Sequence, residues 1–174
     1  MTRIRTNRSI DAPADVVWAV VTDPEVYATV APNLTAVEIV EGEGAGMVRR
    51  CTDTDGNAWL ETVTHWDEGQ SFAVAVDTAS SELHRRLFSR FEGEWRVSTG
   101  PEGVTVTVAF DFDTKYGPLG WLVARYFQYR APALIEAIFD GWEAEIDSRL
   151  GAADHSPGET ADPEDGTRTN QLYR

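Results

Sequence analysis

The alternation of apolar and polar positions predicts an N-terminal strand followed by two short helices. Residues Thr2–Ile10 alternate weakly and are polar enough for a strand at the edge of a sheet. The run Val16–Val21 is apolar on nearly every side, which is typical of a buried helix. Asp23 and Pro24 favour a second helix, with the aspartate as N-cap and the proline in the first turn. Pro32 ends this helix, because a helix interior does not tolerate proline.

Strand-like runs separated by turn residues occupy the middle of the chain. Glycines are frequent over residues 42–46, and the sequence TDGN at 54–57 is a hairpin signal. Apolar residues at 104, 106, 108, 110 and 112 alternate with more polar ones, as in a half-buried antiparallel strand. The runs that we predict as strands are Leu34–Val40, Met47–Asp53, Ala58–Trp66, Ser71–Asp77, Leu83–Val97 and Val104–Asp113.

A long helix is predicted after these strands. Its apolar positions follow a helical period; they are Leu119, Leu122, Val123, Tyr126, Phe127, Ile135, Ile138, Phe139, Trp142, Ile146 and Leu150. Pro132 interrupts the pattern, so we expect a kink or a split into two helices there. A sheet with one apolar face needs a cover, and this helix has one apolar stripe to bury. The pattern therefore favours an α+β fold.

A shift in composition near Gly151 divides the chain into a domain and a tail. Residues 1–150 are enough for one domain with a substantial core. Residues 151–174 are rich in Gly, Pro, Asp, Glu, Thr and Ser, and their few apolar side chains cannot offset the entropy of ordering. We predict that this segment is a disordered acidic tail.

The sequence shows no sign of secretion or of a membrane span. No apolar run approaches the roughly 18 residues of a spanning helix, and the N-terminal arginines are not followed by the apolar segment of a signal peptide. The single cysteine, Cys51, excludes an internal disulfide and suits a reducing compartment. We therefore expect a cytoplasmic protein.

The chain is strongly acidic, with 29 acidic and 15 basic residues and a net charge of −14. Such a surface repels phosphate groups, so nucleic-acid binding is not expected and anionic membrane surfaces are disfavoured. Lys115 is the only lysine. An acidic, lysine-poor surface is common in halophilic proteins, whereas a GC-rich genome would favour the same composition through its codons. Both explanations stay open.

Several segments carry a resemblance to a known superfamily. They are SIDAPADVVW at residues 9–18, TDPEVY at 22–27, the glycine-rich turn before Met47–Arg50, and ETVTHWD at 61–67. Over roughly residues 2–150 the chain resembles the START-like, birch-pollen-allergen-like helix-grip proteins, and within them the polyketide cyclase/dehydrase and coenzyme-Q-binding families. This resemblance implies a helix-grip fold, in which a curved antiparallel sheet of six to seven strands wraps around a long C-terminal helix and encloses an apolar pocket.

Two candidate catalytic residues lie on one predicted strand. Glu61 and His65 are four residues apart, so a regular strand places them on one face together with Trp59 and Val63. If that face lines the pocket, the two could act as general acid and base in an apolar setting. If it faces outward, both are ordinary solvated residues, and the alternation leaves this open. Tyr126, on the long helix, is a third candidate by analogy with the fold.

The remaining polar motifs are interpreted as structural. The three histidines lack the spacing of zinc ligands, and no Gly-x-Ser-x-Gly elbow is present. The glycines at 42–46 precede a strand, unlike a dinucleotide fingerprint. We therefore expect neither a metal nor a cofactor. Arg49 or Arg50 could pair across strands with Glu61 or Glu92, which is usually a surface contact of small value.

The pocket that the resemblance implies would be lined by both the sheet and the long helix. On one side of the predicted strand Leu83–Val97 small and large residues alternate, which leaves volume for a ligand unless bulky neighbours fill it. Arg130 and Tyr126 are polar groups on the helix that could orient a ligand. The candidate ligand-binding residues are Tyr27, Leu34, Phe72, Phe91, Trp95, Phe110, Phe112, Leu122, Tyr126, Arg130, Ile135 and Phe139.

Three functions are compatible with these features. The leading hypothesis is a carrier or sensor that binds a hydrophobic or aromatic small molecule, such as a lipid, an isoprenoid quinone or a polyketide-like compound. The first alternative is a cyclase, aromatase or dehydratase that uses the same cavity. The second alternative is a protein-interaction module like the ribosome-directed, toxin-like members of the superfamily. The same fold serves all three, so it decides neither whether the protein is an enzyme nor its oligomeric state.

Overall fold

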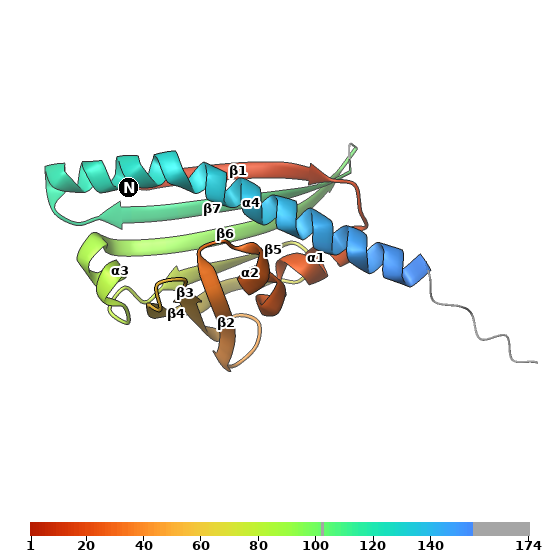
Figure 1. Cartoon of the computed structure of the whole chain (residues 1–174), viewed down its shortest axis with the longest axis horizontal. Coiled ribbons are helices and arrows are strands. Elements are labelled where there is room, and N and C mark those ends of the chain that lie inside the picture. Colours follow the sequence, from red (N-terminus) through yellow and green to blue (C-terminus); the bar gives the residue numbers. More distant parts are fainter. Residues whose placement is uncertain (102, 155–174) are drawn as a thin grey trace, which may run out of the picture.

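One seven-stranded antiparallel sheet and one long helix make up most of the molecule (Figure 1). The structure is a computed structural model and describes residues 1–101 and 103–154. The strand order is β1-β7-β6-β5-β4-β3-β2, so the first and second strands form the two edges of the sheet. Helix α4 crosses one face of this curved sheet, and two short helices follow β1. The predicted α+β helix-grip fold is therefore confirmed.

The strands follow the predicted order, and each pairs with its neighbours in the antiparallel sense. Consecutive strands from β2 to β7 lie side by side, as expected for chain segments joined by short turns. Their bounds are β1 Thr2–Ile10, β2 Leu34–Glu41, β3 Val48–Asp53, β4 Ala58–Asp67, β5 Ser71–Val76, β6 Phe88–Gly100 and β7 Gly103–Thr114.

The two helices after β1 begin where the sequence predicts them. Helix α1 spans Ala14–Val21 and helix α2 spans Pro24–Val30. The side chain of Asp23 accepts hydrogen bonds from the backbone amides of residues 25 and 26, so it caps α2 as expected. Asp23 also lies 3.0 Å from Arg149 near the end of α4, which ties the start of α2 to the last helix.

One predicted strand is wrong in its first third. Residues Glu82–Leu87 form a short helix, α3, and strand β6 begins only at Phe88. The Ser81 side chain accepts a hydrogen bond from the His84 backbone amide at 3.5 Å, and this capping contact favours the helical turn over an extended chain. Because these residues are helical, the side chains of α3 lie beside the sheet and are not part of a strand.

Helix α4 is continuous from Gly120 to Asp154, after a short 3-10 turn, η1, over Gly117–Leu119. Pro132 lies inside it, so the helix is not split there. The helix also continues past the predicted domain end, and residues 151–154 are helical rather than disordered. The rest of the predicted tail lies outside the described residues. None of the helices in the described part of the chain has a stretch long and apolar enough to cross a bilayer.

The hydrophobic core lies between α4 and the face of the sheet that it covers. In the second half of α4 and just before it, four large side chains are no more than 1% exposed: Ile135, Phe139, Trp142 and Ile146. The alternating residues of β7 meet them from the sheet, as the pattern of residues 104–112 predicts. Each such side chain contributes roughly 1.5–3 kcal/mol when it is fully buried, so this half of the helix is firmly attached.

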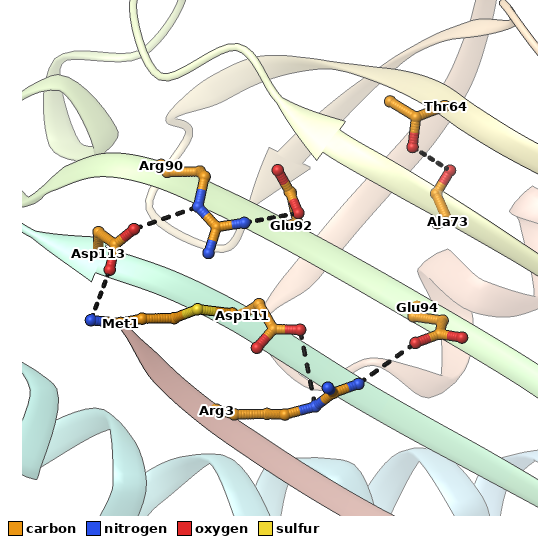
Figure 2. Close-up of polar contacts among 9 residues, drawn as sticks. All are labelled: Met1, Arg3, Thr64, Ala73, Arg90, Glu92, Glu94, Asp111 and Asp113. Atoms are coloured by element: carbon orange, nitrogen blue, oxygen red, sulfur yellow. Dashed lines mark hydrogen bonds and ion pairs between the residues drawn. The ribbon is translucent and has the colours of Figure 1, made fainter.

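The opposite face of the sheet carries ion pairs (Figure 2). The Arg90 side chain bridges Asp113, at 3.2 Å, and Glu92, at 2.7 Å. Arg3 on β1 similarly lies near Glu94, at 3.4 Å. These groups are partly exposed, and exposed pairs contribute only about 0–1 kcal/mol each. This face is therefore a solvated surface, and the apolar chemistry of the molecule is on the side of α4.

Replacing Gly141 with alanine should destabilise the protein. A Cβ at this position would lie 2.6 Å from the Cβ of Val30, because α2 packs directly against α4 there. Overpacking of this kind costs about 1–3 kcal/mol, which exceeds the gain of about 1 kcal/mol from removing a helix glycine. Urea denaturation of Gly141→Ala measures the loss. The control is Gly151→Ala, where the new Cβ would meet nothing within 4 Å, and its stability should not fall.

Candidate ligand-binding cavity

A cavity of about 270 Å³ lies between the sheet and the first half of α4. It is bounded by strands from both halves of the sheet and by α2, α3 and α4. Its lining is dominated by aromatic side chains, namely Tyr27, Trp59, Phe88, Phe91, Trp95, Phe110, Phe112 and Phe127. Aromatic walls offer both edge and face contacts to a ring-containing ligand. The volume is close to the lower limit of small-molecule sites, which is roughly 300 Å³.

Gly93 on β6 lets the Trp95 ring pack against the strand beside the cavity. A Cβ at this position would be 2.7 Å from the ring of Trp95 and 3.2 Å from the ring of Phe110. The Trp95 indole therefore lies close to the strand, where it stacks on Phe72 with ring centroids 4.8 Å apart. Its ring occupies the space that the small residue leaves, so the alternation of small and large residues on this strand does not by itself explain the cavity.

The polar wall of the cavity centres on a buried ion pair. Arg49 on β3 and Glu61 on β4 are directly opposite each other in the sheet and are only 4% and 7% exposed. The Arg49 guanidinium donates to Glu61 Oε2 at 2.6 Å, and the Trp59 indole N–H donates to Oε1 at 2.9 Å. Both carboxylate oxygens are thus occupied. The pair that the sequence predicted as a surface contact is instead buried.

Burial and the ion pair together set the protonation of the neighbouring groups. Burial opposes the charge on Arg49, but the attraction of Glu61 outweighs it and raises the pKa of the guanidinium. Burial first, and then the negative charge of Glu61, raise the pKa values of Tyr27 and Cys51 well above their usual range. Both side chains therefore stay neutral, so the Tyr27 hydroxyl can donate a hydrogen bond and the Cys51 thiol is a poor nucleophile.

His84 on α3 is a second polar group at the cavity. It is 9% exposed, and its ring lies 4.9 Å from the Trp59 ring, centroid to centroid. Its Nδ1 is buried and has no hydrogen-bond partner in the described part of the chain. Burial lowers the pKa of the imidazole, although the charges of Glu61 and Asp53 oppose this shift. The neutral imidazole thus forms part of the cavity wall next to Trp59.

The cavity opens between α3 and the β3–β4 turn. The exposed residues of its lining all gather there: Asn33 before β2, Thr54 and Asp55 in the turn, and Leu83 on α3. The opening is thus polar on one side and apolar on the other. A ligand that enters here would reach His84 and Trp59 before the aromatic interior.

The structure brings together half of the residues predicted to bind a ligand. Those at the cavity are Tyr27, Leu34, Phe91, Trp95, Phe110 and Phe112. Phe72, Ile135 and Phe139 are instead packed in the core. The other three, Leu122, Tyr126 and Arg130, lie on the outer face of α4. The helical period alone does not say which side of the stripe meets the cavity, and the structure assigns that place to Phe127, Ala131, Leu134 and Ile138.

The expectation that Glu61 and His65 share a face is wrong. Val63 pairs with Val74, but His65 pairs with Ala73, so β4 has one extra residue at this point. This β-bulge reverses the alternation. Glu61 faces the cavity, whereas His65 is exposed on the other side of the sheet, 3.4 Å from the Ser71 hydroxyl. His65 and Tyr126 are therefore both outside the cavity.

Two residues of the site escaped sequence reasoning although signals for them were present. Met47, Arg49 and Cys51 alternate, and two apolar neighbours on one face indicate that Arg49 also points inward. His84 follows Ser81 at the spacing of an N-cap, which predicts a helical turn rather than a strand. No three metal-binding side chains gather within residues 1–101 and 103–154.

Comparisons with known proteins agree with this architecture. A family model described as "Polyketide cyclase / dehydrase and lipid transport" matches residues 1–145. No curated protein matches the chain in sequence.

Three solved structures illustrate the similarity in fold. The Zhui aromatase/cyclase from Streptomyces sp. R1128 has a TM-score of 0.71 and 21% identity, over 87% of this chain and 96% of its own. TTHA0849 from Thermus thermophilus has a TM-score of 0.68 and 22% identity, over 84% of this chain and 98% of its own. A START superfamily protein from Mycobacterium smegmatis has a TM-score of 0.66 and 15% identity, over 86% of this chain and 99% of its own. At these identities the likeness concerns the fold.

Removing one partner of the buried ion pair should be far more harmful than removing both. Glu61→Leu leaves the Arg49 charge buried without compensation, which costs about 3–5 kcal/mol. The double variant Arg49→Met/Glu61→Leu has no buried charge, so it should recover most of that loss. Urea denaturation of the three proteins measures the difference. A stable Glu61→Leu variant would show that the pair is not a structural requirement.

Acid should destabilise the protein through His84. Because burial lowers the folded-state pKa below the usual 6.5, the unfolded chain takes up the proton first as the pH falls. Stability is therefore complete above about pH 6.5 and declines as the pH drops from there toward the folded-state pKa. The free energy of unfolding of the natural protein should fall relative to that of His84→Gln over this window. A constant difference between the two proteins across the window would contradict the assignment.

Proposed function

Since the chain belongs to the polyketide cyclase/dehydrase and lipid transport family, we propose that it binds a compact aromatic molecule in its cavity, as a carrier or sensor. The observation that supports this most is the lining itself: eight aromatic side chains surround about 270 Å³ next to a few polar groups. Burial of apolar ligand surface would provide the affinity, and the polar groups would fix the orientation.

The size and shape of the cavity narrow the ligand class. A volume near the lower limit of small-molecule sites favours fused rings over a long acyl or isoprenoid chain. Polyketide-like aromatics therefore suit the cavity better than a full-length lipid or quinone tail. Stacked and edge-on contacts with the aromatic walls would add to simple apolar burial.

The polar groups indicate what the ligand should carry. The neutral Tyr27 hydroxyl can donate to a carbonyl or phenol oxygen. The His84 imidazole, whose Nδ1 has no partner among the described residues, can accept from a hydroxyl or donate to a carbonyl, depending on the tautomer. A ring system with oxygen substituents at both ends would satisfy both groups. Such a ligand would also relieve the cost of the unpaired histidine nitrogen.

The state of the acidic group supports binding more than catalysis. Both oxygens of Glu61 already accept hydrogen bonds and Arg49 pairs with its charge, so this carboxylate is held in place by donors of the protein itself. Tyr27 and Cys51 are held in their neutral forms. These are properties of a fixed polar wall, which would orient a ligand without reacting with it.

A cyclase or aromatase is the second candidate function, and His84 is the observation that favours it. A neutral imidazole at an apolar cavity can act as a general base, and one structural neighbour is an aromatase/cyclase. For this function His84 would move the proton, and Tyr27 would hold the oxygen on which charge develops. His65 and Tyr126 would have no part, because neither reaches the cavity.

Filling the cavity should abolish ligand binding. Ala131 on α4 lines the cavity, whereas Ala133, two residues further, is exposed. We expect 2-naphthol to quench the fluorescence of Trp59 and Trp95 in the natural protein, and Ala131→Phe to weaken its binding by about tenfold or more. Ala133→Phe introduces the same side chain outside the cavity and should bind like the natural protein.

Native mass spectrometry of the freshly purified protein complements this titration. A bound mass that is lost in Ala131→Phe and kept in Ala133→Phe would identify the natural ligand class. Equal binding by both variants would contradict the assigned cavity. Conversion of a polyketide-like compound, rather than its release unchanged, would favour the cyclase instead of the carrier.

A further inference from the structure

The first turns of α4 and the turn before them lie at one end of the molecule (Figure 1). They carry a group of exposed apolar side chains. Six side chains there are between 57% and 82% exposed, namely Tyr116, Leu119, Trp121, Leu122, Tyr126 and Tyr129. We call these six residues the aromatic end of α4. The other exposed large apolar residues of the described chain are only four, and they are scattered over the N-terminus, β2 and α3. Such a concentration marks a contact surface.

Two opposite faces of the helix are apolar in this region. Leu122, Tyr126 and Tyr129 follow the i, i+4, i+7 spacing and so share the outer face of α4. Phe127 and Ala131 lie on the other side and line the cavity. A helix that is apolar on both sides is normally buried on both sides. The outer face therefore lacks its cover in the isolated chain.

The backbone before α4 fixes the position of these side chains. Tyr116 has a φ of 70°, and it is the only residue other than glycine with a positive φ in residues 1–101 and 103–154. At Gly120 a Cβ would lie 2.2 Å from the Lys115 carbonyl oxygen, so the turn is too tight for any side chain. Tyr116 and Leu119 in this turn are 64% and 69% exposed. Strained backbone of this kind clusters at functional sites such as ligand clamps and switch regions.

The charge of this region is opposite to that of the rest of the chain. Residues 115–130 contain three basic residues, Lys115, Arg125 and Arg130, and no acidic one, although the whole chain has a net charge of −14. Neither Arg125 nor Arg130 forms an ion pair within the described residues. Residues 131–154, further along the same helix, contain six acidic and one basic residue. The charged residues that accompany the aromatic end in the sequence are thus all basic, although the molecule is acidic.

We propose that the aromatic end of α4 docks onto a bilayer surface that contains anionic lipids. Tryptophan and tyrosine are the side chains that prefer the headgroup region, and leucine reaches the acyl boundary beneath it. Arg125, Arg130 and Lys115 would contact the lipid phosphates while their aliphatic stems lie along the apolar surface. The acidic remainder of the chain is repelled by the same lipids, so only this end can face the membrane.

The charges and the cavity favour a membrane over other partners. A second copy of the chain would bring the same basic groups together across a two-fold interface, which is unfavourable. The helix that carries the patch is also a wall of the cavity, so docking would place the cavity beside a reservoir of water-insoluble molecules. This last argument rests on the proposed ligand-binding function, whereas the exposed side chains and the charges do not.

Co-sedimentation of the full chain with vesicles tests the proposal. The natural protein should bind vesicles of equal parts phosphatidylcholine and phosphatidylglycerol, bind phosphatidylcholine vesicles weakly, and release at high salt. Each charge is worth roughly fivefold in partitioning, so Arg125→Glu/Arg130→Glu should reduce binding by about tenfold or more. The triple variant Leu122→Ser/Tyr126→Ser/Tyr129→Ser should reduce vesicle binding by a similar factor, because it removes apolar contacts with the bilayer.

Two matched variants control for charge and for apolar surface elsewhere. Arg5→Glu/Arg50→Glu changes the net charge equally at exposed positions on the sheet, and Ile39→Ser/Val40→Ser removes the exposed apolar pair of β2. Both should bind vesicles like the natural protein. The proposal is overturned if the natural protein stays in solution, or if the controls lose as much binding as the α4 variants. It is also overturned if the patch instead forms a dimer that the triple serine variant separates.

The vesicle result and the ligand result can be told apart. The α4 variants should still bind 2-naphthol in solution, because none of their substitutions touches the cavity. Conversely, Ala131→Phe should lose 2-naphthol and keep its vesicle binding. Failure of 2-naphthol binding alone would overturn the proposed function, and failure of vesicle binding alone would overturn only the docking surface.

Discussion

The second half of α4 is attached to the sheet through side chains that are almost completely withdrawn from water, and the rest of the molecule depends on that contact. Phe139, Trp142 and Ile146 hold this half in place, and Ile135 is equally buried just before it. Gly141 allows α2 to approach the same segment closely enough for Val30 to touch it. Because one half of the helix is fixed so firmly, the other half can cover the sheet without filling the space beneath it. The cavity lies where Phe127, Ala131, Leu134 and Ile138 of the helix cover the sheet.

The polar wall of the cavity is an energetic compromise. A buried arginine and carboxylate are costly to desolvate, and their mutual attraction offsets that cost only with good geometry and further hydrogen bonds. Arg49 and Glu61 meet this condition in part: they lie 2.6 Å apart with the Trp59 indole as an additional donor, while the Arg49 Nε has no hydrogen-bond partner among the described residues. The pair also fixes its neighbours, since its negative member helps to keep Tyr27 protonated. A small number of fixed polar groups thus accompanies an otherwise aromatic interior, which is the arrangement that orientates an apolar ligand.

Charge is distributed unevenly over the surface, which the net charge of the chain does not reveal. The overall charge of −14 disfavours anionic surfaces, yet the charged residues of 115–130 are all basic and lie among exposed aromatic side chains. Electrostatic attraction falls off within about 10 Å at ordinary salt, so a local patch can act against the charge of the whole. The same helix is acidic further along, where Arg8 on β1 is held by Glu136, Asp140 and Glu143.

The order of elements, the α+β class and the apolar face of β7 could be predicted from the sequence alone, because they follow from local periodicity and from turn residues. It also identified half of the ligand-binding candidates, for the same reason: strand alternation places Phe91, Trp95, Phe110 and Phe112 on one side. The places where that regularity fails depend on contacts made in the folded chain. An extra residue in β4 separates His65 from Glu61, and the cross-strand register buries Arg49. The packing of α4 turns Leu122, Tyr126 and Arg130 outward. Such features depend on contacts between distant segments, and no pattern along a single segment contains them.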